Sequence, residues 1–185
     1  GIGFGMQTIV NNFLSGLILI FSRTLHEGDV IDVGNLQGVV RKISVRATTV
    51  ETFDNAIIFV PNSEFVSNRL INWTRNGRIV RREVAIGVAY GTDPKLVERL
   101  LVEVAQSVPQ IVRRPQPFVL FMDFADSTLN FVLRYWSDIG TATDAASAIR
   151  HRIVEVFAEH QVEIAFPQLD VHVIPQTPSL TRAEG

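Results

Sequence analysis

Of all the patterns in the sequence, the spacing of the first three glycines is the most similar to a ligand-binding motif. Gly1, Gly3 and Gly5 form a G-x-G-x-G run. A dinucleotide-binding loop requires a strand before the glycines, a G-x-G-x-x-G spacing and an acidic residue about 20 residues later. Asp29 and Asp32 lie at a tolerable distance, but the glycine spacing differs and the segment runs on into membrane-like sequence. A nucleotide-dependent enzyme is therefore the least favoured interpretation.

Other side chains capable of catalysis are poorly spaced for joint chemistry. Asp123, Asp126 and Asp138 could be proposed as a carboxylate site, but Asp126 is more simply explained as a turn residue. His151 and His160 are nine residues apart, a spacing that does not place both on one helical face. The sequence has no cysteine, no G-x-S-x-G, no Walker loop and no H-E-x-x-H. We expect no enzyme, no catalytic residue, no metal and no cofactor.

The composition predicts folded domains. It gives the chain no strong positive electrostatic field that would attract nucleic acid. Hydrophobic residues make up 46% of the 185 residues, charged residues make up 19%, and the formal net charge is -2. The exception is a cluster of arginines at positions 75, 78, 81 and 82. With a small predicted β-barrel, this cluster supports an alternative, a soluble RNA- or ligand-binding module. The β-rich region lacks an array of aromatic residues for stacking bases, so we expect no nucleic-acid partner.

The opening segment has the periodicity of an amphipathic helix. Its apolar stripe consists of Met6, Ile9, Val10, Phe13, Leu14, Leu17, Ile18 and Phe21. A polar row of Gln7, Asn11 and Ser15 has Thr8 and Asn12 beside it. Such a helix can lie with one side in lipid and one side in water, and a surface helix of a soluble domain fits the pattern equally well. The polar residues interrupt the run of about 20 apolar residues that a clean bilayer span requires.

The rest of the sequence predicts a β-rich region followed by an α/β region. Short strands are expected at 30–33, 39–52 (one bent strand or two short ones), 56–60 and 71–74, which suggests a small barrel. Further on, strands are expected at 80–89, 118–124 and 129–136, helices at 95–108 and 144–160, and a last strand pattern at 162–164 and 169–174. The order β-α-β-β-α-β predicts a ferredoxin-like α/β sandwich.

Several sequence stretches together resemble one known family. They are GIGFGMQTIVNNFLSGLILIF, EGDVIDVG, ATTVETFDNAIIFVPNSEFVSNRLINWT and IGVAYGTD. In this order they resemble the small-conductance mechanosensitive channel (MscS-like) family, and its large MscK-like members most closely. The resemblance covers residues 1 to about 174.

The resemblance implies a tension-gated ion channel in the bacterial inner membrane, with residues after about 27 in the cytoplasm. It implies a homoheptamer that contacts membrane lipids and releases ions and small osmolytes on hypoosmotic shock. The implied domains are a pore-lining and interfacial helix (1–27, the C-terminal part of the last transmembrane helix), an Sm-like β domain (28–74), a ferredoxin-like α/β domain (75–167) and a C-terminal strand and tail (168–185).

The resemblance also assigns residues of the opening helix. Phe4 matches a pore-constricting position, and the family's other constriction position would precede Gly1, where we expect further membrane-spanning sequence. Gly1 and Gly3 match small positions where neighbouring pore helices pack, and Gly5 continues that series.

The resemblance also assigns two hinge positions in the helix and one contact between the helix and the β domain. Gln7 matches a glutamine at the bend between the pore half and the interfacial half of the helix. The family's prototype has a hinge glycine next, where this chain has Thr8, which can still bend a helix by bonding back to a carbonyl. Gly16 matches the second hinge glycine. Asn12 and Asn55 match positions where the pore helix touches the β domain, and Asn55 replaces a family glycine.

Overall fold

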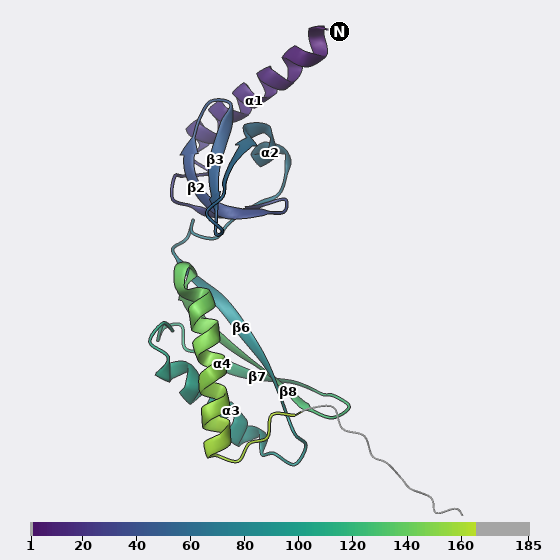
Figure 1. The fold of residues 1–185 in the computed structure, drawn as a ribbon, viewed down its shortest axis with the longest axis vertical. Helices are drawn as coiled ribbons and strands as arrows, with labels where there is room; N and C mark the ends of the chain where they lie inside the picture. Colours follow the sequence, from purple (N-terminus) through teal and green to yellow (C-terminus); the bar gives the residue numbers. More distant parts are fainter. Residues whose placement is uncertain (1, 166–185) are drawn as a thin grey trace, which may run out of the picture.

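The computed structural model describes the backbone of residues 2–165 and the side chains of residues 6–165, and its parts follow one another along a single long axis (Figure 1). Helix α1 (Ile2–Ser22) lies at one end, and a β-rich block of residues 28–74, the β block, follows it. An α/β block from residue 75 onward occupies the other end. Among the described residues, no helix has an apolar stretch long enough to cross a lipid bilayer.

The β block is one five-stranded antiparallel sheet in the order β4-β3-β2-β1-β5. Its strands are β1 (Val30–Val33), β2 (Leu36–Ile43), β3 (Ala47–Thr52), β4 (Ile57–Pro61) and β5 (Leu70–Asn72). The stretch 39–52, predicted as one bent strand or two short ones, belongs to two strands. Strands β4 and β5 are the ends of this order, and no ladder joins them within residues 28–74. Closure into an Sm-like barrel stays a prediction.

A short helix that the sequence did not predict closes one end of the β block. Helix α2 (Asn62–Ser67) follows β4 directly, with Pro61 at its N-cap. Its Phe65 is 5% exposed and joins the core of the block. That core contains Leu19, Leu25, Ile31, Val33, Val40, Val50, Val60 and Phe65. Because Leu19 comes from α1, this helix is part of the same folded unit.

The α/β block begins with the predicted order of elements. Strand β6 (Ile79–Val88), helix α3 (Pro94–Ser107), strands β7 (Phe118–Phe124) and β8 (Leu129–Asp138), a 3-10 turn (Ile139–Thr141) and helix α4 (Ala142–Glu159) follow one another. The antiparallel sheet has the order β6-β8-β7, and an antiparallel bridge between Val88 and Ile164 adds a position beyond β6. This is the strand order of a ferredoxin-like sandwich. The strand expected at 169–174, and with it the proposed C-terminal unit at 168–185, lies outside the described residues.

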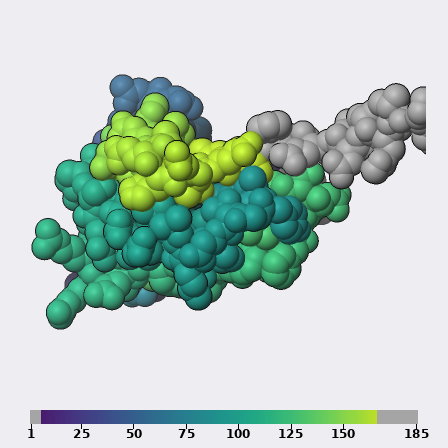
Figure 2. Space-filling view, turned by 90° about the horizontal axis from the view of Figure 1, so that it is seen from below, coloured from purple at the N-terminus to yellow at the C-terminus, as the bar shows by residue number. Residues whose placement is uncertain are grey.

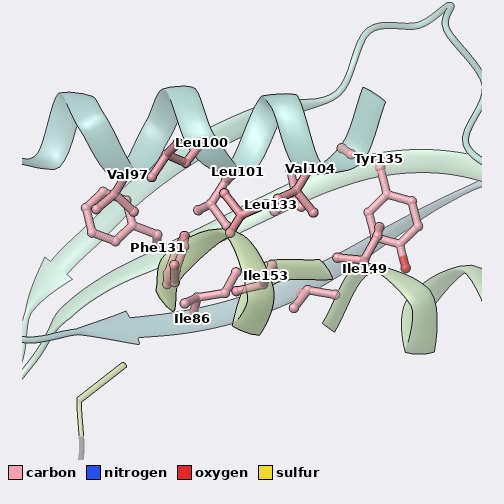
Figure 3. Packing of buried hydrophobic residues seen from close by; sticks show 14 of the residues in the cluster. Ile86, Val97, Leu100, Leu101, Val104, Phe131, Leu133, Tyr135, Ile149 and Ile153 are labelled. Carbon is pink, nitrogen blue, oxygen red and sulfur yellow. The ribbon is translucent and has the colours of Figure 1, made fainter. Parts of the chain in front are cut away.

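Helices α3 and α4 pack against one face of this sheet and against each other (Figures 2 and 3). Asp93 caps α3 by accepting a hydrogen bond from the backbone N–H of Lys95, and Pro94 occupies the first helical turn, as the sequence predicted. The buried side chains include Val97, Leu100 and Leu101 of α3, Ile149 and Ile153 of α4, and Phe131, Leu133 and Tyr135 of β8. This core is separate from that of the β block.

Candidate functional site

Helix α1 exposes its apolar side. Eight of its large hydrophobic residues are exposed, by fractions that run from 44% for Ile20 to 80% for Phe21. These residues are Met6, Ile9, Val10, Phe13, Leu14, Ile18, Ile20 and Phe21. They include most of the apolar stripe predicted from the sequence. A contiguous exposed apolar surface of this kind marks a site for lipid or another protein surface.

The side of α1 that packs against the β block consists of small and polar residues and one leucine. Asn12, Ser15, Gly16 and Leu19 are buried and follow the helical spacing i, i+3, i+4 and i+7. They face α2 and the end of β2, where α1 makes its contacts with the β block. A surface helix of a globular protein normally buries its apolar face. Helix α1 is therefore inverted relative to that rule.

Gly16 is the point of closest approach between α1 and the β block. A Cβ placed on Gly16 would lie close to the backbone carbonyl oxygen of Val45 and 2.5 Å from Nδ2 of Asn62. A backbone oxygen held in a turn cannot move aside cheaply, so only glycine fits here. The sequence resemblance assigned Gly16 to a hinge, whereas the structure shows it as a packing residue within a continuous helix. The hinge roles of Gln7, Thr8 and Gly16 stay predictions, since all three lie inside α1.

Asn12 supplies the hydrogen-bond acceptor that α2 lacks at its own N-terminus. The N-cap residue of α2 is Pro61, which provides no side-chain cap. The Oδ1 atom of Asn12 accepts a hydrogen bond of 3.1 Å from the backbone N–H of Ser63, in the first turn of α2. The first N–H groups of a helix have no partner within it, so this contact satisfies one of them. Asn12 thus ties α1 to the β block, and its role in a pore helix stays a prediction.

Asn62 holds the same junction together from within the β block. Its side chain is fully buried, accepts a 2.9 Å hydrogen bond from Oγ1 of Thr48, and donates a 2.8 Å hydrogen bond to the carbonyl oxygen of Ser44. Its backbone N–H donates to the carbonyl oxygen of Arg46 at 3.2 Å. Asn62 therefore fixes the turn between β2 and β3 against the start of α2. The sequence reading treated Pro61-Asn62 as the end of a strand and missed this role.

We expect the substitution Asn62→Ala to destabilise the β block by about 2 kcal/mol, because it leaves the buried Thr48 hydroxyl and the Ser44 carbonyl without partners. Urea unfolding of the purified full-length protein measures this change. Asn68→Ala is the matched control, since Asn68 is an exposed asparagine at the end of α2. Equal stability of the two variants would contradict the role assigned to Asn62.

The other predicted site residues lie elsewhere. Asn55 is exposed at the turn between β3 and β4, with φ of 65°, and its N–H donates to the carbonyl oxygen of Thr52. It forms no hydrogen bond with the described part of α1, so its contact with a pore helix stays a prediction. Gly1 lies outside the described residues. Gly3, Phe4 and Gly5 fall in the first turns of α1, where only the backbone is described.

The carboxylates considered for catalysis do not come together. Asp123 pairs with Asn130 near the start of β8, whereas Asp138 pairs with Ile79 at the far end of that ten-residue strand. Asp138 is also bound to Arg78 at 2.9 Å. Within residues 6–165, no group of three or more acidic or histidine side chains is placed to hold a metal ion.

The sequence matches two parts of one family in succession. Residues 8–75 match "Mechanosensitive ion channel, beta-domain" and residues 83–164 match "Mechanosensitive ion channel MscS, C-terminal". The first region contains most of α1 and the β block, and the second contains the α/β block from β6 to the bridge at Ile164.

Individual proteins show the same similarity. An uncharacterized MscS family protein of Haemophilus influenzae is 44% identical over 174 residues, which cover 94% of this chain. The mechanosensitive channel MscK of Escherichia coli is 38% identical over 174 residues, again 94% of this chain. The chain spans 16% of the length of each of these relatives. The closed-state crystal structure of Helicobacter pylori MscS superposes with a TM-score of 0.85 at 27% identity, over 95% of this chain and 69% of that chain.

Proposed function

Because the chain belongs to the MscS family of mechanosensitive ion channels, we propose that the protein is an ion channel that membrane tension opens, releasing ions and small osmolytes on hypoosmotic shock. The observation that carries the proposal is the inverted packing of α1. Its small and polar side holds it to the β block, while side chains such as Ile9, Phe13 and Ile18 remain uncovered. This arrangement suits a helix that leaves a water-soluble block and meets lipid or its own copies.

Copies of α1 around a central axis would line the pore. Gly1, Gly3 and Gly5 provide small positions where neighbouring helices approach closely. Phe4 then forms an apolar ring that sheds water, and ions do not cross a dry constriction. Tension favours the wider state because it occupies more membrane area, and the closed and open states need to differ by only a few kcal/mol.

The edges of the β block support a ring of identical subunits. Strand β4 is an edge of the sheet, and its Ile57, Ile58 and Phe59 are 50%, 37% and 71% exposed. Strand β5 is the opposite edge. Pairing of β4 in one copy with β5 in the next is a head-to-tail contact, which closes into a ring when the rotation fits. We propose a homoheptamer, the number that the family resemblance implies.

The junction between α1 and α2 couples the pore to the part of the protein outside the membrane. We place the protein in the bacterial inner membrane, with residues after about 27 in the cytoplasm. In that arrangement the β domain (28–74) and the α/β domain (75–167) form the cytoplasmic vestibule. Movement of α1 during opening is then transmitted through Asn12, Gly16 and Asn62 to the β domain.

Patch-clamp recording of the full-length protein in a lipid bilayer tests the proposed function. We expect stepwise currents that appear as suction on the membrane patch increases. Absence of tension-activated current from protein that is inserted and correctly assembled would reject the proposal.

The substitution Phe4→Ser is expected to wet the constriction and to leave the channel open without tension. Growth of cells carrying this variant should slow, and ion leakage in the absence of osmotic shock should rise severalfold. Phe124→Ser is the control, because Phe124 is 73% exposed at the end of β7 and that strand lies far from α1. Unchanged leakage in cells carrying Phe4→Ser would contradict a pore-constricting role for Phe4.

A further inference from the structure

The arginine cluster at positions 75–82 has no part in the gating scheme described above. It lies in and after the segment that joins the β block to the α/β block, between β5 and β6. Four arginines within eight residues, with no carboxylate among them, form a concentrated positive charge in a chain whose net charge is -2. The question is which of these guanidinium groups already have partners.

A cavity of about 510 Å³ lies at this junction. It is lined by Asn72, Trp73, Asn76, Gly77, Ile79, Val80, Arg81 and Trp136. The volume falls within the range of about 300–1,000 Å³ that is typical of small-molecule sites. The walls come from the end of β5, the connecting segment, β6 and β8, so both blocks contribute to the cavity.

Two groups on the walls of this cavity lack partners. The indole Nε1–H of Trp73 is buried and has no hydrogen-bond acceptor among the described residues. Buried polar groups are nearly always satisfied, so an unpaired donor at a cavity requires an explanation. Arg81 is exposed and forms no ion pair within residues 6–165. The Trp73 N–H is enclosed by protein and is not reached from the cavity, so Arg81 is the donor that favours a ligand with negatively charged oxygen atoms.

The nearby carboxylates are already neutralised by other arginines. Asp138 accepts hydrogen bonds of 2.9 and 3.0 Å from Arg78, and Glu83 accepts one of 3.2 Å from Arg134. The hydrogen bonds from Arg78 and from the backbone N–H of Gly140 lower the pKa of Asp138, so this carboxylate stays charged and stays with Arg78. No free carboxylate therefore competes with a ligand for Arg81 at this end of the described sheet.

The cavity also offers flat aromatic surface. The sequence contains two tryptophans, and both of them line it. Trp73 and Trp136 are half-buried, so part of each ring remains available for contact. The guanidinium of Arg82 lies 5.8 Å from the centroid of Trp73, which holds that ring by a cation–π interaction. Indole rings stack readily on the faces of nucleobases.

We propose that this junction cavity binds a mononucleotide, with its base against the exposed parts of the indole rings and its phosphate at Arg81. Arg81 supplies charged donors, which bind phosphate oxygens more strongly than neutral ones. Asn76, whose side chain lines the same cavity, adds an amide for the base or the sugar. The proposal concerns binding alone and holds whether or not the protein conducts ions.

Isothermal titration calorimetry of the full-length protein in lipid nanodiscs, with adenosine monophosphate as the probe, tests this proposal. We expect saturable binding, with clearly weaker binding of inorganic phosphate and of adenosine. Arg81→Gln should weaken binding of adenosine monophosphate by about tenfold or more, because it removes a charge-assisted hydrogen bond. Trp136→Leu should weaken binding of both adenosine monophosphate and adenosine.

The matched control is Arg113→Gln, which removes an arginine from the wall of a different cavity, of about 390 Å³, that has no tryptophan. It should leave binding of adenosine monophosphate unchanged, and gel filtration should show the same assembly for all variants. The proposal is overturned if adenosine monophosphate does not bind, if Arg81→Gln binds it normally, or if inorganic phosphate binds equally well. A side chain of a neighbouring subunit that fills the cavity in the assembled protein would also overturn it.

Discussion

Replacing Gly16 by alanine is expected to loosen the attachment of α1 to the β block and to destabilise the protein by about 1–3 kcal/mol, the usual effect of overpacking a close contact. In an ordinary helix the same substitution would stabilise by about 1 kcal/mol, because alanine has the higher helix propensity. The sign reverses here because the new methyl group would meet the Val45 carbonyl and the Asn62 amide.

Amide hydrogen exchange of the full-length protein gives a local measure of this effect. Exchange at the start of α2 should accelerate in Gly16→Ala, since the Ser63 N–H would lose its hydrogen bond to Asn12. Asn11→Ala is the control, because Asn11 is exposed on the same helix. If Gly16→Ala leaves exchange at α2 unchanged and raises thermal stability, Gly16 does not act as a packing residue.

Replacing Phe131 by alanine should have a larger effect on stability, about 3–5 kcal/mol. Phe131 is fully buried in the centre of the α/β core, and its ring stacks on that of Phe121 with centroids 4.8 Å apart (Figure 3). Helices α3 and α4 both pack against β8, so the site cannot collapse easily around the lost ring. Most of the stability of this block should disappear.

Thermal unfolding of the purified full-length protein measures the change. Phe53→Ala removes a ring of the same size from the turn after β3, where it is 63% exposed, and should change stability by less than about 0.5 kcal/mol. Because the α/β block has its own core, α1 and the β block should keep their hydrogen-exchange protection in the Phe131 variant. Loss of protection throughout the chain would show that the two blocks unfold together.

Periodicity predicted most of the elements because long elements carry several repeats of their pattern. Strands β1 and β7 have the predicted bounds, and α3 begins at the predicted cap. Helix α2 escaped prediction because its six residues hold fewer than two helical turns and follow a proline that also suits a turn. The sequence allows the stretch 39–52 to be one bent strand or two short ones, because no glycine or proline marks the break that the structure has at 44–46.

The functional junction was predicted only in part. Asn12 came from the family resemblance, and in the structure its side chain accepts a hydrogen bond from Ser63 of α2, while its role in a pore helix stays a prediction. Its partner, Ser63, and the supporting Asn62 depend on where α2 sits, which no local pattern reveals. The inverted packing of α1 could not be predicted from the sequence either, because the same amphipathic pattern fits a helix that buries either face. Which face is buried depends on the match between Gly16 and the Val45 turn.

The uncovered edge at β4 has a consequence for how the protein is made. Ile57, Ile58 and Phe59 present apolar side chains beside a row of unpaired backbone groups, and such edges pair readily with other extended chains. In the proposed ring, a newly synthesised subunit is prone to aggregate until a neighbouring copy pairs with that strand. Biogenesis should favour insertion of many copies close together in space and time, and production in excess of membrane capacity should yield aggregates seeded at this strand.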